Sequence, residues 1–267
     1  MPRDEAPPAV ARAEPPGGLG ERATARGALG ERAMTLDAEL AGADAVAVLR
    51  RAVSDPAFGR VALVSSFGAE SVALLHLAAR VDPSVPVLFV DTEMLFPETL
   101  AYQVEVAASL GLRDVRRIAP GRSATFLRDG DALLHRSDPE ACCALRKVEP
   151  LERALEGFDA WITGRKRHQG GARAALPVVE AADGRLKVNP LAAWTREEVG
   201  AYIDRHGLPR HPLVAKGYAS IGCAPCTTPV REGEDARAGR WRGRDKDECG
   251  IHFENGRAVR GPRRSAA

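Results

Sequence analysis

Blocks of apolar residues alternate along this chain with segments of helical periodicity. Uninterrupted apolar runs bounded by polar residues are typical of strands buried on both faces of a parallel sheet. Two such runs lie at 60–66 and 85–92, a weaker strand pattern lies at 114–120, and a further strand pattern lies at 158–164. Helical patterns follow them at 70–81, 97–111, 145–157 and 195–207. The alternation predicts one α/β domain, with an open parallel sheet and helices on both of its faces.

Local signals mark the ends of two predicted helices. Pro97 lies in the first turn of one helix and Gly111 just beyond its last turn, which are the favoured places for these residues. Thr195 and Glu198 have the spacing of a capping box, and Gly207 follows that helix.

The composition changes at both ends of the chain. Residues 1–33 are rich in Ala, Arg, Pro and Gly, with almost no large apolar side chains, and we expect them to be disordered. Met34 opens the first patterned segment and is a candidate start codon. We therefore predict a disordered extension over 1–33, a folded domain over 34–230 and a mobile C-terminal tail over 231–267.

Charge and cysteine content narrow the class of protein. The chain has 38 basic and 36 acidic side chains, which gives no electrostatic case for general nucleic-acid binding. Its apolar runs are too short to span a bilayer, and its N-terminal segment carries charges where a signal peptide needs an apolar core. A cytoplasmic protein is expected, in which five cysteines serve more often as metal ligands or catalytic thiols than as disulfides.

Candidate binding residues follow the predicted strands, and ligands of open parallel sheets bind beyond the carboxyl ends of the strands. Small residues at 65–71 lead from a strand into a helix and expose N–H groups suited to phosphate or sulfate. Asp91 and Thr92 stand at the next strand tip, where they can bind a ribose or a base. A tight turn and a capped turn are the structural alternatives.

A third loop, at 163–173, is strongly cationic. It places Arg165, Lys166, Arg167 and Arg173 among glycines. Arginine offers bidentate hydrogen bonds to phosphate and sulfate oxygens, so this loop is a candidate anion-binding loop. A solvated charge run is the alternative.

Four of the cysteines form two pairs, Cys142 with Cys143 and Cys223 with Cys226. Four thiolates can hold zinc or an iron–sulfur cluster. Adjacent cysteines fit a structural zinc site poorly, whereas a 4Fe–4S cluster spreads its ligands over several irons. The iron–sulfur interpretation is therefore favoured; zinc and unpaired core thiols stay open.

With these motifs in order, the chain resembles the assimilatory adenylyl-sulfate reductases, the iron–sulfur branch of the phosphoadenylyl-sulfate reductase family. The similar segments lie at 66–71, 91–99, 142–151, 161–173, 187–195, 211–227 and 239–252. The resemblance implies an adenine nucleotide alpha hydrolase-like fold of the PP-loop type. It also implies a 4Fe–4S cluster on Cys142, Cys143, Cys223 and Cys226.

The resemblance assigns the catalytic role to Cys249, in the C-terminal tail. Its thiolate would attack the sulfur of adenylyl sulfate, expel AMP and form an S-sulfocysteine. A thiol of thioredoxin, or of a glutaredoxin-like reductant, would then release sulfite for cysteine biosynthesis. Neighbouring cations favour such a thiolate.

The substrate-binding residues implied by the resemblance come from all of these loops. They are Ser65, Ser66, Gly68, Glu70, Asp91, Thr92, Lys147, Arg165, Arg173, Arg240, Arg242 and His252. The loop at 65–71 also resembles the SGGxDS loop of ATP pyrophosphatases, but Phe67, Ala69 and Glu70 depart from it and argue against ATP cleavage. The stretch at 168–170 and Asp247 depart from the reductase pattern.

Three other functions remain open at this point. Reduction of 3'-phosphoadenylyl sulfate is one, although such reductases typically lack the four cluster cysteines. An iron–sulfur tRNA-thiolating enzyme of the same fold would need a basic RNA-binding surface and would not account for the sequence around Cys249. A zinc-stabilised binding module would use the paired cysteines only for structure.

Overall fold

The computed structural model describes residues 19–244, 246, 253–254 and 257–258 of the 267-residue chain. Its helices are α1 (Leu19–Glu39), α2 (Ala45–Ser54), α3 (Ser71–Val81), α4 (Pro97–Ser109), α5 (Arg122–Asp129), α6 (Leu134–Ser137), α7 (Pro139–Cys143), α8 (Glu149–Ala154) and α9 (Arg196–Arg205). Its strands are β1 (Val61–Ser65), β2 (Val87–Val90), β3 (Val115–Ile118), β4 (Ala160–Ile162), β5 (Val179–Ala182), β6 (Arg185–Val188), β7 (Phe253–Glu254) and β8 (Arg257–Ala258). Among the described helices, none is long and apolar enough to cross a membrane.

Short helical turns complete the described elements. Five are 3-10 turns and one, η2, is a π-helix. They are η1 (Pro56–Phe58), η2 (Ala144–Val148), η3 (Arg167–Gln169), η4 (Gly171–Arg173), η5 (Pro212–Lys216) and η6 (Ala224–Cys226).

The main sheet has six strands in the order β3-β2-β1-β4-β6-β5. All neighbouring pairs are parallel except β5 and β6, which form an antiparallel hairpin at one edge. The predicted open α/β fold is confirmed, with this antiparallel edge strand as an addition. The chain builds outward from β1 to β3 and then returns to β4 on the other side of β1. This reversal makes the carboxyl ends of β1 and β4 the place where such sheets bind ligands.

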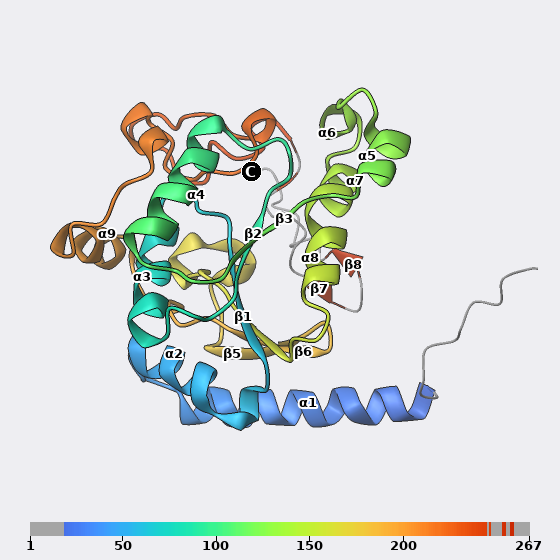
Figure 1. Ribbon diagram of the computed structural model, residues 1–267, viewed down its shortest axis with the longest axis vertical. Helices are drawn as coiled ribbons and strands as arrows, with labels where there is room; N and C mark the ends of the chain where they lie inside the picture. Colours follow the sequence, from blue (N-terminus) through green and yellow to red (C-terminus); the bar gives the residue numbers. More distant parts are fainter. Residues whose placement is uncertain (1–18, 245, 247–252, 255–256, 259–267) are drawn as a thin grey trace, which may run out of the picture.

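Helices cover both faces of the sheet (Figure 1). Successive strand residues point to opposite faces, so Leu63 joins the larger core under α2, α3, α4 and α9, while its neighbour Ala62 joins a smaller core. Leu151 of α8 packs in that smaller core together with Trp161 of β4. Burial on both faces explains why the central parallel strands β1, β2 and β4 are nearly continuous apolar runs.

Helix α1 differs from the sequence prediction, because it begins at Leu19 and so includes residues 19–33, which were expected to be disordered. Ala, Leu, Arg and Glu are strong helix formers, and the helix is anchored further along by Leu36 and Leu40 in the core. Asp37 accepts hydrogen bonds from the N–H groups of Val178 and Val179, at 2.7 and 3.0 Å. Figure 1 shows α1 lying along β5 and β6. Residues 1–18 lie outside the described residues.

The boundary predicted at residue 230 also differs from the structure. Trp241 is 3% exposed, and its N–H donates to the Cys226 carbonyl at 3.0 Å. The Thr228 N–H donates to the Gly239 carbonyl at 2.8 Å. Residues 231–244 therefore pack against the domain instead of forming the start of a separate tail.

Candidate active site

The loop after β1 forms one wall of a cavity at the carboxyl edge of the sheet. Gly68 N–H donates to Ser71 Oγ at 3.0 Å, and Phe67 N–H donates to Ser65 Oγ at 3.1 Å. Phe67 has a φ of 47°, unusual for a residue other than glycine, and its fully buried ring contacts Phe89 edge-on. Buried packing thus holds a strained turn in place, as is common at binding sites.

A second segment, 219–223, closes the cavity against this loop. A Cβ at position 68 would lie 3.4 Å from the Ile221 carbonyl oxygen, so the two segments are in van der Waals contact. The chain that leads to this segment is anchored to α4 at His211, which is 1% exposed. Its Nδ1 accepts the Leu213 N–H at 3.2 Å, which leaves Nε2–H to donate to Thr99 Oγ1 at 3.0 Å. Burial lowers the pKa of His211 to about 4, so this link is uncharged at neutral pH.

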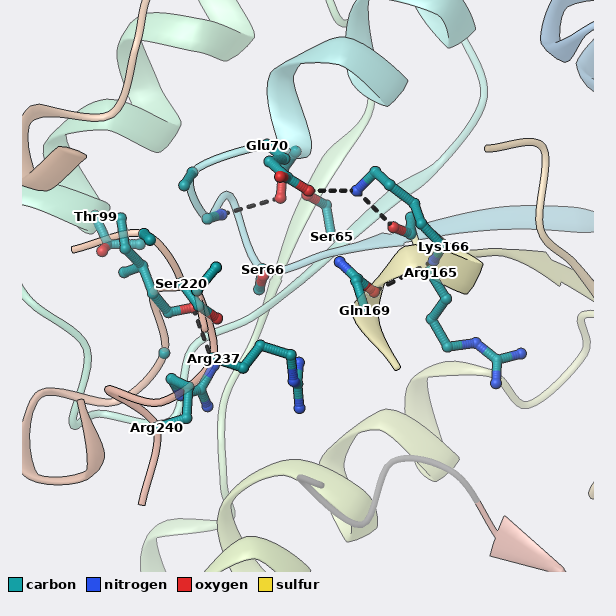
Figure 2. A pocket seen from close by; sticks show the side chains of 18 of the residues that line it. Ser65, Ser66, Glu70, Thr99, Arg165, Lys166, Gln169, Ser220, Arg237 and Arg240 are labelled. Atoms are coloured by element: carbon teal, nitrogen blue, oxygen red, sulfur yellow. Dashed lines mark hydrogen bonds and ion pairs between the residues drawn. The ribbon is translucent and has the colours of Figure 1, made fainter. Parts of the chain in front are cut away.

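The resulting cavity has a volume of about 250 Å³ and brings together most of the predicted substrate-binding residues. Those that line it are Ser65, Ser66, Gly68, Glu70, Thr92, Lys147, Arg165, Arg173 and Arg240. Figure 2 shows Ser65, Ser66 and Glu70 facing Lys166 and Gln169, with Ser220, Arg237 and Arg240 on another side. Cations from three separated segments therefore surround a single space.

The cationic loop after β4 is organised by its own hydrogen bonds. Arg165 pairs with Glu180 of β5 and donates to Asn189 Oδ1 at 3.1 Å. Arg173 donates to Gln169. Arg167 instead donates to the Leu176 carbonyl at 2.8 Å and does not line the cavity.

Lys166 links this loop to the loop after β1. Its Nζ lies 2.7 Å from Glu70 Oε2 and 3.1 Å from the Gly164 carbonyl oxygen, and its side chain is 3% exposed. Burial raises the pKa of Glu70, but the positive charge and hydrogen bond of Lys166 outweigh this effect and hold it below its usual value. Burial lowers the pKa of Lys166, and Glu70 opposes that decrease. The ion pair ties the two loops together at one end of the cavity.

Two predicted substrate-binding residues do not line the cavity, so the structure corrects their roles. Asp91 is 1% exposed; it accepts the Glu93 N–H at 2.8 Å and pairs with Arg117, whose Nε lies 2.6 Å away. Arg242 forms a two-pronged ion pair with Glu234, at 2.6 and 2.9 Å. The hydrogen bond from Arg242 is the main cause that lowers the pKa of Glu234 to about 2.

Arg196 and Arg237 line the cavity but were missed in the sequence. Arg196 begins α9, and Arg237 lies three residues before Arg240 in the segment assigned to the tail. Arg237 belongs to the same basic stretch, 237–244, as the predicted Arg240 and Arg242, so the sequence could have indicated it as a candidate. The stretch did not show which of its arginines face the cavity.

Arg237, which lines the cavity, and Arg242, which does not, give a matched pair of variants. We expect Arg237→Ala to weaken anion binding, and to lower kcat/KM by about 100-fold, because a charged hydrogen-bond donor to a reacting anion is worth about 3 kcal/mol. Arg242→Ala should leave kcat/KM within about threefold and lower the melting temperature by a few degrees, since it removes only an exposed ion pair. Steady-state kinetics and thermal unfolding measure the two effects; the reverse pattern would contradict this placement.

The paired cysteines surround a second, smaller cavity next to the first. Cys142 and Cys143 end α7, which Asp138 caps, and Cys223 and Cys226 flank η6. All four line this cavity, together with Arg146 and Lys147, and none is in a disulfide. Burial, together with the nearby Cys143 and Cys223, raises the pKa of the Cys142 thiol to about 12. Burial also raises the pKa of Cys226.

The π-helix η2 contains Arg146 and Lys147, which lie where the two cavities meet. Such single turns are rare and frequently occur at functional sites. Arg146 is 4% exposed and pairs with the buried Asp129 at 2.7 Å. It also donates to the Thr92 carbonyl at 3.0 Å. This network fixes η2 against the tip of β2 and so orients the next residue, Lys147.

Lys147 and Cys223 line both cavities. Thr92 joins the same boundary, because its Oγ1 lies 3.2 Å from Cys223 Sγ. An anion in the larger cavity and a group bound by the four thiols would therefore share Lys147 as a neighbour. Cys249 and His252, predicted as nucleophile and substrate contact, lie outside the described residues.

A cavity lined by cations at the switch point of a parallel sheet is typical of an anion-binding α/β protein. Comparison with known proteins identifies the family. Residues 60–229 match the phosphoadenosine phosphosulfate reductase domain family, and the chain belongs to this family.

Individual relatives agree with this placement. The chain is 52% identical over 195 residues to adenosine 5'-phosphosulfate reductase of Chelativorans sp. (strain BNC1), a match that covers 73% of this chain and 80% of the relative. It is 43% identical over 213 residues to phosphoadenosine 5'-phosphosulfate reductase of Gloeobacter violaceus, covering 77% and 87%.

A solved structure shows the same architecture. The phosphate complex of phosphoadenylyl-sulfate (PAPS) reductase from Candida auris superposes with a TM-score of 0.64 at 30% identity. The match covers 73% of this chain and 96% of that one.

Proposed function

We propose that this protein reduces adenylyl sulfate to sulfite and AMP, with thioredoxin or a glutaredoxin-like protein as the reductant. The observation that carries the proposal is the junction of the two cavities at Lys147 and Cys223. The larger cavity offers cations to a phosphosulfate group. Relatives named adenosine 5'-phosphosulfate reductase support this choice of substrate.

In this proposal the cavity holds the substrate and Cys249 performs the chemistry. Lys147, Arg237 and Arg240 neutralise the phosphosulfate, which makes its sulfur accessible to an anionic nucleophile. The Cys249 thiolate forms a bond to that sulfur as the bond between the sulfur and the bridging oxygen breaks. AMP leaves with the bridging oxygen, and Cys249 becomes an S-sulfocysteine.

The reductant then supplies both electrons. One thiolate of thioredoxin attacks Cys249 Sγ, forms a mixed disulfide and expels sulfite. The second thioredoxin thiol attacks this disulfide, so that Cys249 leaves as a thiol and thioredoxin as an internal disulfide. Two electrons pass from the dithiol to the sulfonate sulfur, and the balance needs no other donor.

We further propose that Cys142, Cys143, Cys223 and Cys226 bind a 4Fe–4S cluster. Within the described ranges, no three His, Cys, Asp or Glu side chains are arranged to hold one metal ion. Four thiols that are not in disulfides nevertheless surround one cavity, and a cluster takes each thiolate on a different iron. The soft donor set and the nearby Arg146 and Arg244, whose charges favour thiolates, fit such a group. Bound there, the cluster would order the cysteine segments and add a charge that Lys147 balances.

Metal content tests this assignment. Protein purified without oxygen should be brown and contain about four iron atoms per chain. Cys226→Ser should lose most of this iron, whereas Cys249→Ser should keep it, since Cys249 is not a proposed ligand. A colourless protein with zinc in the same site would contradict the cluster and favour the zinc-stabilised module.

The proposal extends to organisation and location. The nucleotide-binding reductase domain would include 34–230 together with the packed segment 231–244, and the chain beyond it would deliver Cys249 to the substrate and then to the reductant in the cytoplasm. Movement of a chain end between two partners suits such a two-step reaction.

Sulfite release tests the reaction and substrate together. Anaerobically purified protein with thioredoxin is given adenylyl sulfate or its 3'-phosphorylated form. We expect a strong preference for adenylyl sulfate. Preference for the phosphorylated form would support the second candidate, which Arg173 and Arg196 in the cavity and the Gloeobacter violaceus relative favour. If neither nucleotide yields sulfite, both reductase functions are contradicted, and tRNA thiolation on the same fold becomes the favoured alternative.

A further inference from the structure

His168, in the stretch that departs from the family pattern, presents a hydrogen-bond acceptor at the substrate cavity. It belongs to η3 and lines the cavity. Its Nδ1 lies 2.8 Å from the Trp194 carbonyl oxygen. A carbonyl oxygen only accepts, so Nδ1 carries a proton, and whenever the ring is neutral Nε2 has a lone pair. Within the described part of the chain, this Nε2 is buried and has no hydrogen-bond partner.

Glu70 supplies a second acceptor at the same end of the cavity. Its Oε2 accepts from Lys166 at 2.7 Å, but a carboxylate has two oxygens and accepts several hydrogen bonds. Glu70 and His168 both line this cavity. Lys166 is engaged by Glu70 and by the Gly164 carbonyl. This end of the cavity therefore contains two groups that can accept a hydrogen bond from a ligand.

We propose that His168 Nε2, assisted by Glu70, accepts a hydrogen bond from the ribose 3'-hydroxyl and thereby selects adenylyl sulfate over its 3'-phosphorylated form. The inference rests on the proposed function, because it places an adenine nucleotide in this cavity. A 3'-phosphate dianion has no proton to donate, so it would leave Nε2 unpaired. It would also bring negative charge towards the Glu70 carboxylate.

The same logic separates other nucleotide pairs. Sites for NAD use an acidic residue to accept a hydrogen bond from a ribose hydroxyl, whereas sites for NADP place an arginine near the phosphate that replaces it. Rejection by unpaired buried groups can be strong, since a site built to bind a hydroxyl loses much affinity for an analogue without one. His168 is thus a specificity-determining residue rather than a catalytic one.

Two cations oppose this interpretation and make it testable. Arg173 and Arg196 line the same cavity and exert their charge on Lys166. Arg173 donates to Gln169, and Arg196 lies on an exposed position at the start of α9. If these arginines decided the preference, a 3'-phosphate would strengthen binding. The acceptors and the cations therefore predict opposite orders of affinity.

Equilibrium binding of nucleotides without a sulfonate group provides the test. Calorimetry on the anaerobically purified protein compares AMP, 3'-deoxy-AMP and adenosine 3',5'-bisphosphate. We expect the protein to bind AMP about tenfold more tightly than either of the others, as one hydrogen bond to a buried acceptor implies. His168→Phe, which keeps a ring but removes Nε2, should bind AMP and 3'-deoxy-AMP with nearly equal affinity. His206→Phe changes an exposed histidine outside the cavity and should retain the tenfold difference.

Each other outcome overturns the inference. Equal loss of affinity for AMP and 3'-deoxy-AMP in His168→Phe would show that the ring only supports the fold of the loop. Tighter binding of the bisphosphate by the unaltered protein would assign the selection to Arg173 and Arg196. Sulfite release from adenylyl sulfate, with no effect of the 3'-hydroxyl on affinity, would overturn this inference and leave the proposed function intact. Absence of AMP binding would contradict both.

Discussion

Cys249→Ser is expected to abolish sulfite release while the protein keeps its iron and its affinity for AMP. The first step requires a thiolate that attacks sulfur, and a serine hydroxyl is not ionised near neutral pH and is a far weaker nucleophile. The proposed cluster ligands and the cavity lie elsewhere in the chain, so they should be unaffected. Measurements of sulfite, iron content and AMP binding on the same preparation check the three expectations.

Two results would contradict this role for Cys249. Sulfite release that persists in Cys249→Ser would place the nucleophile elsewhere, in the substrate cavity or on the reductant. Loss of iron in this variant, with Cys226→Ser as the comparison, would make Cys249 a ligand instead. Cys249→Ala separates a residual effect of the serine hydroxyl from loss of the thiol.

The second large effect is expected at Lys147, since it lines both cavities. Lys147→Met keeps the aliphatic length and removes the charge. We expect kcat/KM for adenylyl sulfate to fall by about 100- to 1,000-fold, the usual cost of removing one electrostatic contact to a reacting group. The iron content should change little, because Lys147 is not a proposed ligand.

A matched lysine controls for the general effect of a lost positive charge. Lys216 is paired with Glu98 at 2.9 Å, with 61% of its side chain exposed, and it lines neither cavity. Lys216→Met should therefore retain kcat/KM within about twofold, as surface pairs contribute little. Equal losses in the two variants would contradict a specific role for Lys147.

The strength of the hydrophobic pattern decided which parts of the fold were predictable. Strands β1, β2 and β4 were predicted because burial makes them nearly continuous apolar runs, whereas β3, with two exposed arginines, gave a weaker signal. Strands β5 and β6 were missed, since Glu180 and Lys187 interrupt their apolar pattern. Their turn carried a usable signal, however: Asp183 and Gly184 both have positive φ values, as a two-residue hairpin turn requires.

Helix α1 was missed for a different reason. Its first half is rich in small and charged residues, and composition alone does not distinguish a solvated helix from a disordered segment. The deciding contacts are tertiary ones, such as that of Asp37 with the backbone of β5.

The candidate site shows the same limit. Loops at strand ends were identified because the topology of parallel sheets brings such ends together. The directions of side chains within those loops depend on partners far away in sequence or on irregular backbone. Asp91 turns to Arg117, and Arg242 turns to Glu234, whereas Arg237 lines the cavity. No periodic pattern in the sequence encodes these choices.

The most direct test of the proposed chemistry is a single turnover without reductant. Protein is mixed with an excess of adenylyl sulfate labelled in the sulfate group, and AMP and labelled peptides are quantified. The proposal predicts one AMP per chain, no free sulfite, and one SO3 group on the peptide that contains Cys249, released as sulfite when thioredoxin is added. Release of sulfite before any thiol is added, or label on another residue, would contradict it.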